Sequence, residues 1–376
     1  HYTDGSIDTA HIADGQVTVA KLAYNPNPFR NIIINGDMSL AQRGTSSSSN
    51  TTGGYVTCDR WLADIDTQGT WTLSQSTDVP TGQGFANSFK YDCTTADASP
   101  AAGDKINLQQ RLEGQNLQYL KKGTSSAEST TISFWVKSAK TGTYIVELYD
   151  ENNRDISKSY TISNANTWEK KTLTFAGDTS GALGNDNGSS LQVSWFLAVG
   201  SNYSSGTLNT SWNSNTNANR AVGQVNHADS TSNDWLITGV QLEAGTTASD
   251  FEFLPVDVNT TRCLRYYQKS YSYATAPGTN TTNGLHTTDG SAGGLTTGYL
   301  TGDINLKENM RAAPTVTLYD KAGNSGVSAR LRSGVARTDN QNCSAGDIIE
   351  KSFSIVSTGT ANANSIDVHF EATAEL

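Results

Sequence analysis

Two nearly identical ten-residue repeats, at residues 4–13 and 14–23, open the chain. Each repeat offers an Asp-Gly turn, one β-branched residue and one further aliphatic residue. That apolar surface is too small to offset the roughly 1–2 kcal/mol of backbone entropy that every residue loses on folding. Other copies of the chain must therefore supply the core, which predicts a fibrous stalk inside an intertwined oligomer. The aliphatic residues of the repeats are Ile7, Ile12, Val17 and Leu22.

We expect the stalk to be a parallel homotrimer with residues 1–23 at its axis, because a threefold arrangement lets each aliphatic side chain meet two copies of itself. Pro26 and Pro28 then stiffen an extended linker, since each proline also pushes its predecessor out of the helical region. Stalk and linker are together predicted over residues 1–28. The abrupt start at His1 suggests the distal end of a longer fibre.

The composition favours an all-β protein. Only 35% of the residues are hydrophobic and only 16% are charged. Gly, Ser, Thr and Asn make up the difference, and they populate turns and solvent-facing strand positions, while long runs of the helix formers Ala, Leu, Glu and Lys are missing.

Alternating apolar and polar residues predict strands separated by polar turns. The clearest case is Ile132, Phe134 and Val136, which share one face of a strand. Seven or more strands before residue 256 indicate a sandwich of two antiparallel sheets, which we place at residues 29–256. The predicted strands are residues 31–35, 71–75, 130–137, 143–149, 168–175, 191–199 and 235–243.

A second boundary falls near Pro255 and is followed by one predicted helix, residues 259–269, capped by Asn259. Its basic and aromatic residues could contact nucleic acid or an acidic glycan, but we expect Cys263 and Tyr266 to bury one face between two domains instead. Alternation at residues 365–374 predicts a strand that closes a smaller C-terminal β-domain, residues 257–376.

The formal net charge of −10 argues against a nucleic acid or an anionic membrane surface as partner, so neutral partners such as sugars fit better. No apolar stretch approaches the roughly 18–20 residues of a membrane helix, and we expect no membrane insertion. The four scattered cysteines are interpreted as mostly buried free thiols, with a Cys58–Cys93 bridge as the alternative.

Several phrases, taken in this order after the repeats, resemble the distal part of bacteriophage tail fibre and receptor-binding proteins. The resemblance covers nearly the whole chain. It implies a jelly-roll domain like that of carbohydrate-binding modules, a small β-sandwich tip domain, homotrimeric assembly, attachment to other tail proteins through the N-terminal stalk, and a place on the virion, extracellular on release. The phrases are residues 31–38, 41–44, 59–61, 110–113, 132–137, 239–245, 262–267, 310–315 and 370–376.

We therefore expect a virion adhesin that binds a host-surface polysaccharide or lipopolysaccharide and is not an enzyme. Three identical tips would raise avidity without any new contact. Two alternatives stay open, a purely structural virion component and a capsule-degrading enzyme with paired carboxylates. The sequence offers the latter little support, because its five histidines lie in unrelated contexts and it has no nucleophile elbow or phosphate loop.

Recognition is expected in the long polar loops and in segment 274–298, because loops outside shared phrases usually carry specificity. Trp212 lies in a long polar segment, where its ring could stack on a sugar or pack inside. Tyr203, Trp168 and Asn213 are the further candidates. By contrast, strand tryptophans are expected to cover the sandwich core: Trp61, Trp135, Trp195 and Trp235.

Asp37 and Glu243 are candidate ligands of a structural calcium ion. In similar carbohydrate-binding jelly rolls, an acidic residue after the first strand and another on the last strand often bracket such an ion, with carbonyl oxygens completing the shell. The alternative is that both carboxylates simply accept hydrogen bonds from loop amides.

Overall fold

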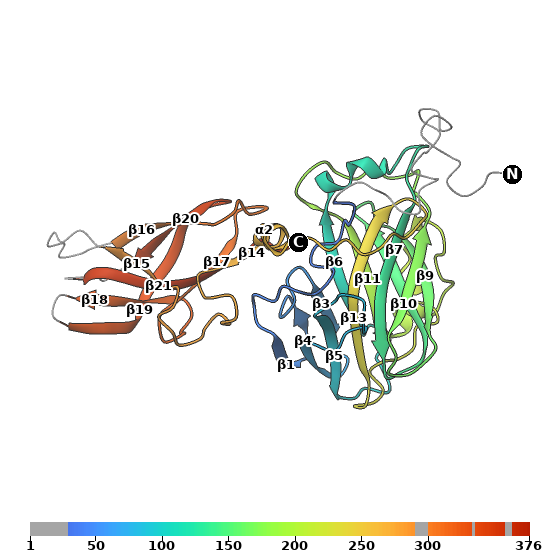
Figure 1. Cartoon of the computed structure of the whole chain (residues 1–376), viewed down its shortest axis with the longest axis horizontal. Helices are drawn as coiled ribbons and strands as arrows, with labels where there is room; N and C mark the ends of the chain where they lie inside the picture. The colour runs from blue at the N-terminus through green and yellow to red at the C-terminus, as the bar shows by residue number, and fades with distance from the viewer. Residues whose placement is uncertain (1–28, 290–299, 333–334, 358–362) are drawn as a thin grey trace, which may run out of the picture.

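The computed structural model describes residues 29–289, 300–332, 335–357 and 363–376, and Figure 1 shows two lobes with helix α2 (Val256–Leu264) between them. The predicted stalk, linker and trimer axis lie outside the described residues, as does segment 274–298 from residue 290 onward.

The first lobe is a jelly-roll β-sandwich whose strand pairs are antiparallel. The six-stranded sheet has the order β1 (Ser46–Asn50), β4 (Thr70–Ser76), β5 (Ser88–Thr95), β13 (Asp234–Ala244), β7 (Thr130–Ser138) and β10 (Glu169–Phe175). The seven-stranded sheet has the order β12 (Asn213–Ser214), β9 (Arg154–Ile162), β8 (Gly142–Asp150), β11 (Ser189–Val199), β6 (Lys105–Glu113), β3 (Leu62–Asp66) and β2 (Gly53–Gly54).

The core between the sheets is built from the alternating side chains of their strands. Ile132, Phe134 and Val136 of β7 are fully buried, as their alternation predicts. Two tryptophans pack at its centre, the Trp61 and Trp195 rings with centroids 5.6 Å apart. Large buried side chains of this kind stabilise the sandwich by about 25 cal/mol for each Å² of apolar surface removed from water.

Two expectations about this lobe are wrong. Trp135 is only half-buried, because it points to the side of β7 opposite Phe134 and cannot reach the core. Residues 31–35 form no strand, since side chains there satisfy the backbone in place of a ladder. The Asn31 side-chain oxygen accepts from Ile33 N at 3.0 Å, and that of Asn35 accepts from Leu40 N at 3.0 Å.

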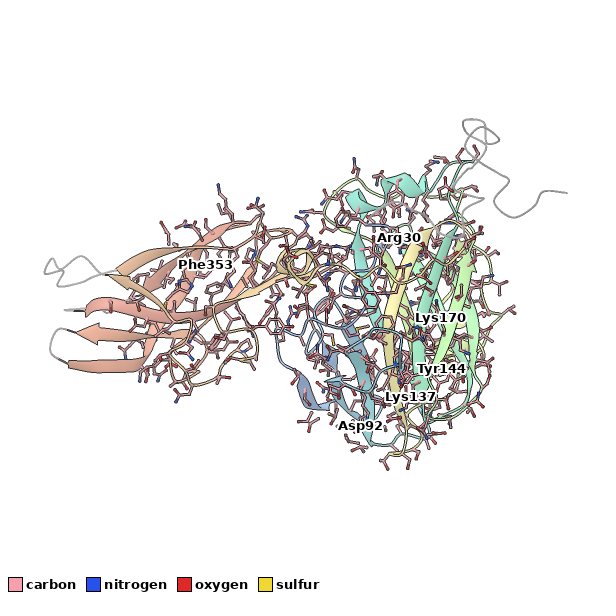
Figure 2. All side chains as sticks on the ribbon, in the orientation of Figure 1. Arg30, Asp92, Lys137, Tyr144, Lys170 and Phe353 are labelled. Carbon is pink, nitrogen blue, oxygen red and sulfur yellow. The ribbon has the colours of Figure 1, made fainter. Side chains whose placement is uncertain are left out.

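The second lobe is a smaller β-domain organised around the long strand β21 (Ala363–Thr373). Ile366, Val368 and Phe370 of this strand are buried, as the alternation predicts, and Phe353 packs on Phe370 with ring centroids 5.2 Å apart (Figure 2). Its other strands are β14 (Tyr267–Lys269), β15 (His286–Asp289), β16 (Leu300–Asn305), β17 (Thr315–Tyr319), β18 (Val327–Arg332), β19 (Val335–Ile349) and β20 (Ser352–Ser357).

Helix α2 lies between the lobes but differs from its prediction at both ends. It starts at Val256 after the N-cap residue Pro255, and Asn259 is buried inside the helix instead of capping it. It ends at Leu264, because the backbone that follows pairs with β21 as strand β14. The expected burial between domains is confirmed, since Cys263 and Tyr266 are almost fully buried.

Ion pairs connect the segment that follows β21 to the sandwich. We call the three residues that form them, Arg43, Arg60 and Glu375, the junction clamp. Glu375 forms ion pairs with both arginines, the Arg43 Nη2 to Glu375 Oε1 distance being 3.1 Å. Arg60 is fully buried. Beside the clamp, Tyr55 Oη donates to the Leu376 carbonyl at 3.0 Å.

Cys58, Cys93 and Cys263 are buried and are not bridged to one another. The interpretation as mostly buried thiols is confirmed, and the alternative Cys58–Cys93 bridge is wrong. Among the described residues, we find no helix with the length and apolarity needed to cross a membrane.

Candidate functional site

The outward side of the seven-stranded sheet carries partly exposed aromatic and polar side chains, which we call the outer face. Tyr149 of β8, Gln192 of β11 and Arg111 of β6 are directly paired across three strands, and each is half-buried. Cβ atoms of directly paired residues lie about 4.5–5.5 Å apart, so the three side chains form a row about 10 Å long. Tyr203 and Arg220 complete the outer face.

Arg220 is fixed on the sheet by the buried carboxylate of Glu147. Its Nε and Nη2 atoms donate to Glu147 Oε1 and Oε2, each at 2.6 Å, in a forked geometry. Burial alone would lower the pKa of Arg220, but the hydrogen bonds and charge of Glu147 outweigh it, so the pKa is raised and the guanidinium stays protonated.

Three aromatic rings surround this guanidinium. Its central carbon lies 5.2 Å from the ring centroid of Tyr149, 5.8 Å from that of Phe196 and 5.9 Å from that of Tyr203. Phe196 is buried, while the two tyrosines are half-buried and keep part of each ring in solvent. Rings immobilised in this way lose little conformational entropy when a ligand covers them.

The polar segment that supplies Tyr203 is held down by its own asparagines. Asn209 and Asn215 donate to the two oxygens of Asp155, at 2.9 and 3.0 Å. Asn213, on edge strand β12, is exposed, and its amide donates to the neighbouring Ser211. Most of these amides therefore order the loop, and Asn213 is the one named candidate among them that faces solvent.

Trp212 and Trp168 are both half-buried and already use their ring nitrogens. Trp212 packs against the sandwich core, and its Nε1 donates to the Ala176 carbonyl at 2.8 Å, while the Lys122 ammonium lies 5.0 Å from its ring. Trp168 Nε1 donates to Asp78 Oδ1 at 2.9 Å. Part of each ring remains in contact with solvent.

The structure thus gathers only some of the predicted binding residues. Tyr203 belongs to the outer face, and Asn213 lies at the β12 edge of the same sheet next to Trp212, whereas Trp168 directly precedes β10 of the other sheet. Sequence reasoning missed Tyr149 and Arg220. The alternation in residues 143–149 could have revealed Tyr149 as outward-facing, but no local signal marks Arg220.

The donors around Asp37 and Glu243 do not fit a calcium ion. Asp37 Oδ1 accepts from the Ser39 hydroxyl at 2.9 Å. Both Glu243 oxygens accept from Ser249, each at 2.8 Å, and the Arg30 guanidinium lies 4.0 Å away, where a cation would be repelled. No group of three or more His, Cys, Asp or Glu side chains suited to a metal occurs within the described ranges. This geometry favours the hydrogen-bonding alternative.

No protein-family model and no curated protein matches the sequence. Solved structures do resemble part of it. The enzymatically active domain of bacteriophage CBA120 tailspike protein 4 has 17% identity and a TM-score of 0.30, covering 58% of this chain and 22% of that one, so this chain spans about a fifth of its length.

Two carbohydrate-binding modules resemble the chain at a similar level. TmCBM61, solved with β-1,4-galactotriose, has 8% identity and a TM-score of 0.28, covering 57% of this chain and 99% of that one. The family 11 module of Clostridium thermocellum, solved with a mixed-linked tetrasaccharide, has 13% identity and a TM-score of 0.25, covering 55% and 99%. At these TM-scores the likenesses carry no functional argument.

Proposed function

We propose that this chain is the distal part of a virion tail fibre that attaches to a host-surface polysaccharide or lipopolysaccharide through the outer face, without chemical turnover. The observation that carries the proposal is the fixed Tyr149–Arg220–Tyr203 arrangement beside Gln192, whose half-buried amide donates one hydrogen bond to the Ser194 hydroxyl at 2.8 Å. Sugar rings stack on aromatic rings, and their hydroxyls bind amide and guanidinium groups. Such a surface suits a neutral or weakly charged glycan.

The proposed adhesin acts as a homotrimer that joins other tail proteins through residues 1–28. Each outer face binds weakly, because one half-buried ring adds only about 1 kcal/mol beyond the area it covers. Three copies on one fibre and several fibres on one particle multiply this affinity by about 10²–10⁴ through effective concentration. Attachment is thereby strong while single contacts remain reversible.

The test measures binding of the full chain to an array of neutral hexose and deoxyhexose oligosaccharides. Tyr149→Ala removes one ring and should weaken binding about fivefold, whereas Tyr149→Phe, which keeps the ring, should lose less than about twofold. Lys170→Ala, at an exposed position on the opposite sheet (Figure 2), serves as the control and should bind like the parent.

If Tyr149→Ala binds as well as the parent, the outer face is not the glycan-binding site. Trp212→Ala and Trp168→Ala belong in the same series, since each ring retains solvent contact. Release of shorter sugars from the array would instead support the capsule-degrading alternative.

A further inference from the structure

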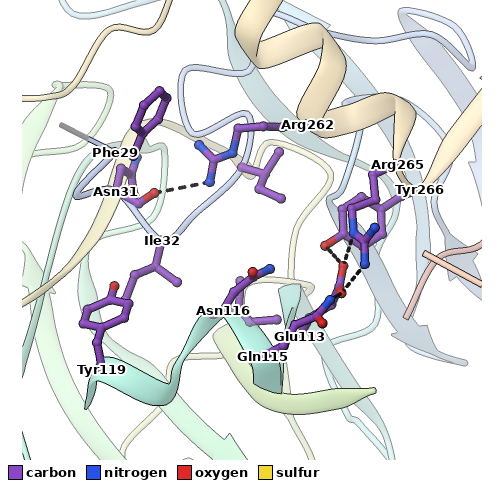
Figure 3. A pocket seen from close by; sticks show the side chains of 12 residues that line it. Phe29, Asn31, Ile32, Glu113, Gln115, Asn116, Tyr119, Arg262, Arg265 and Tyr266 are labelled. Carbon is purple, nitrogen blue, oxygen red and sulfur yellow. Dashed lines mark hydrogen bonds and ion pairs between the residues drawn. The ribbon is translucent and has the colours of Figure 1, made fainter. Parts of the chain in front are cut away.

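A cavity of about 400 Å³ opens between helix α2 and the sandwich (Figure 3), and its lining includes none of the residues that define the outer face. Its sandwich wall includes the short helices η3 (Gly114–Asn116) and η4 (Gln118–Leu120). We call it the junction groove. The side chains used below are Phe29, Glu113, Asn116, Tyr119, Arg262 and Arg265.

One of the two arginines in the junction groove is fully paired. Arg265 donates from Nε and Nη2 to the Glu113 oxygens, each at 2.7 Å, and Gln115 Nε2 donates to Glu113 Oε2 at 2.6 Å. Burial alone would raise the pKa of Glu113, but hydrogen bonds from Arg265 and Tyr266 outweigh it and hold the pKa below its usual range. Glu113 and Arg265 therefore cancel each other's charge.

The second arginine, Arg262, has no such partner. In the part of the chain that the structure describes, it donates a single hydrogen bond, from Nη2 to the Asn31 carbonyl at 3.3 Å. Glu252 has only a longer-range electrostatic effect on Arg262, because its two carboxylate oxygens accept hydrogen bonds from the Phe29 and Asn31 backbone amides at 2.7 and 2.9 Å. The junction groove thus holds one uncompensated positive charge.

Burial makes this charge costly. It lowers the pKa of Arg262, because the half-buried guanidinium has lost part of its hydration and gains only a hydrogen bond to a neutral carbonyl in return. Figure 3 shows the guanidinium projecting from α2 into the groove, with Asn116 pointing toward the same space from the opposite wall. An anion that entered the groove would restore the missing interaction.

The rest of the lining favours a sugar as the carrier of that anion. Tyr119 and Phe29 line the groove, and these residues are 49% and 62% exposed, so their rings offer faces on which a pyranose can stack. The amide of Asn116 is exposed and can bind hydroxyls. Both arginines also line a second cavity of about 460 Å³ with Lys307, which gives a longer chain room to continue along α2.

We propose that the junction groove is a second glycan site that binds a carboxylate-bearing sugar, such as a uronic acid unit of an acidic polysaccharide. Arg262 holds the carboxylate through its forked N–H groups, Tyr119 stacks on the ring, and Asn116 binds a hydroxyl. This goes beyond the proposed function, because the site and the ligand class both differ from those of the outer face.

The experiment titrates the full chain with trigalacturonic acid and with its methyl ester by calorimetry at low salt. The acid should bind, and the ester should bind about 10–100-fold more weakly, since it cannot form the charge-assisted pair. Arg262→Gln should cause a similar loss and Arg262→Lys a smaller one. Lys170→Gln removes one exposed positive charge from β10 and should leave binding unchanged.

Tyr119 is exposed, so Tyr119→Ala should fold like the parent, and the loss of the ring should weaken binding severalfold. Tyr149→Ala, on the outer face, should leave the binding of trigalacturonic acid unchanged. The two proposed sites are therefore tested separately, and a negative result for the outer face would not affect this one. The proposal is overturned if the parent does not bind the acid at about 10 mM, where even a weak site is occupied. It is also overturned if the ester binds as well as the acid, or if Arg262→Gln and Tyr119→Ala both bind like the parent.

Discussion

Replacing Glu375 with glutamine removes the only acidic member of the junction clamp while keeping its size. Arg60 is fully buried, and its guanidinium carbon lies 3.5 Å from the ring centroid of Tyr266, so water cannot replace the lost carboxylate. Burial alone would lower the pKa of Arg60, but the charge of Glu375 outweighs it and raises the pKa. Without Glu375 the buried cation keeps its charge and loses its counter-ion.

Removing one partner of a buried ion pair typically costs about 3–5 kcal/mol of unfolding free energy. The amide of Glu375→Gln can still accept one hydrogen bond, and Arg60 Nη2 still donates to the Arg111 carbonyl at 2.7 Å. We therefore expect a loss of about 3 kcal/mol, and with a shift of about 2–4 °C for each kcal/mol the melting temperature should fall by about 6–12 °C.

Thermal and denaturant unfolding of the parent and the variant measure this loss. Glu128→Gln is the matched control, because the Glu128–Lys121 pair is exposed and its removal should cost no more than about 1 kcal/mol. Combining Glu375→Gln with Arg60→Met should cost less than the sum of the two single changes, since the second removes the orphaned charge. A loss below about 1 kcal/mol for Glu375→Gln would refute the reasoning.

Three further predictions concern acid, calcium and assembly. Burial lowers the pKa of His227 from 6.5 to about 3, so the unfolded state binds more protons than the folded state between these two pH values. The free energy of unfolding should therefore fall by about 1.4 kcal/mol for each pH unit between pH 6.5 and pH 3. His227→Gln should show a smaller dependence of stability on pH in acid denaturation. Excess chelator should leave the melting temperature unchanged, and a clear decrease would restore the calcium site at Asp37 and Glu243. Light scattering of the intact chain should give three times the 40.1 kDa mass, and a stable monomer would contradict the trimer.

The sequence predicts strands well where one face is apolar and the other polar. In β7, Ile132, Phe134 and Val136 alternate with polar residues, and the strand forms where expected. Strand β6 escaped prediction because Gln110 interrupts its apolar side. Gln110 is fully buried and exchanges hydrogen bonds with the Ile34 backbone, at 2.8 and 2.9 Å, across 76 residues of sequence. A polar residue gains such a partner only after the chain has folded.

The candidate sites show the same limit. Tyr203 could be suspected because it lies in a long polar loop, but its neighbours Tyr149 and Arg220 join it only through the register of β8 and the return of the loop across the sheet. The pairing of Arg265 with Glu113, which leaves Arg262 without a counter-ion, depends on contacts between residues about 150 positions apart. Composition and spacing carry no information about such arrangements.

The junction clamp also determines how a pulling force on the second lobe would reach the sandwich. The second lobe is tethered to the sandwich by helix α2 at its beginning and by Glu375 and the Leu376 carbonyl at its end. A pull on the lobe therefore loads two attachments in parallel, and the lobe can swing away only when both have yielded. Such a force is thus shared between a covalent connection and a cluster of buried charges, instead of bending a single hinge.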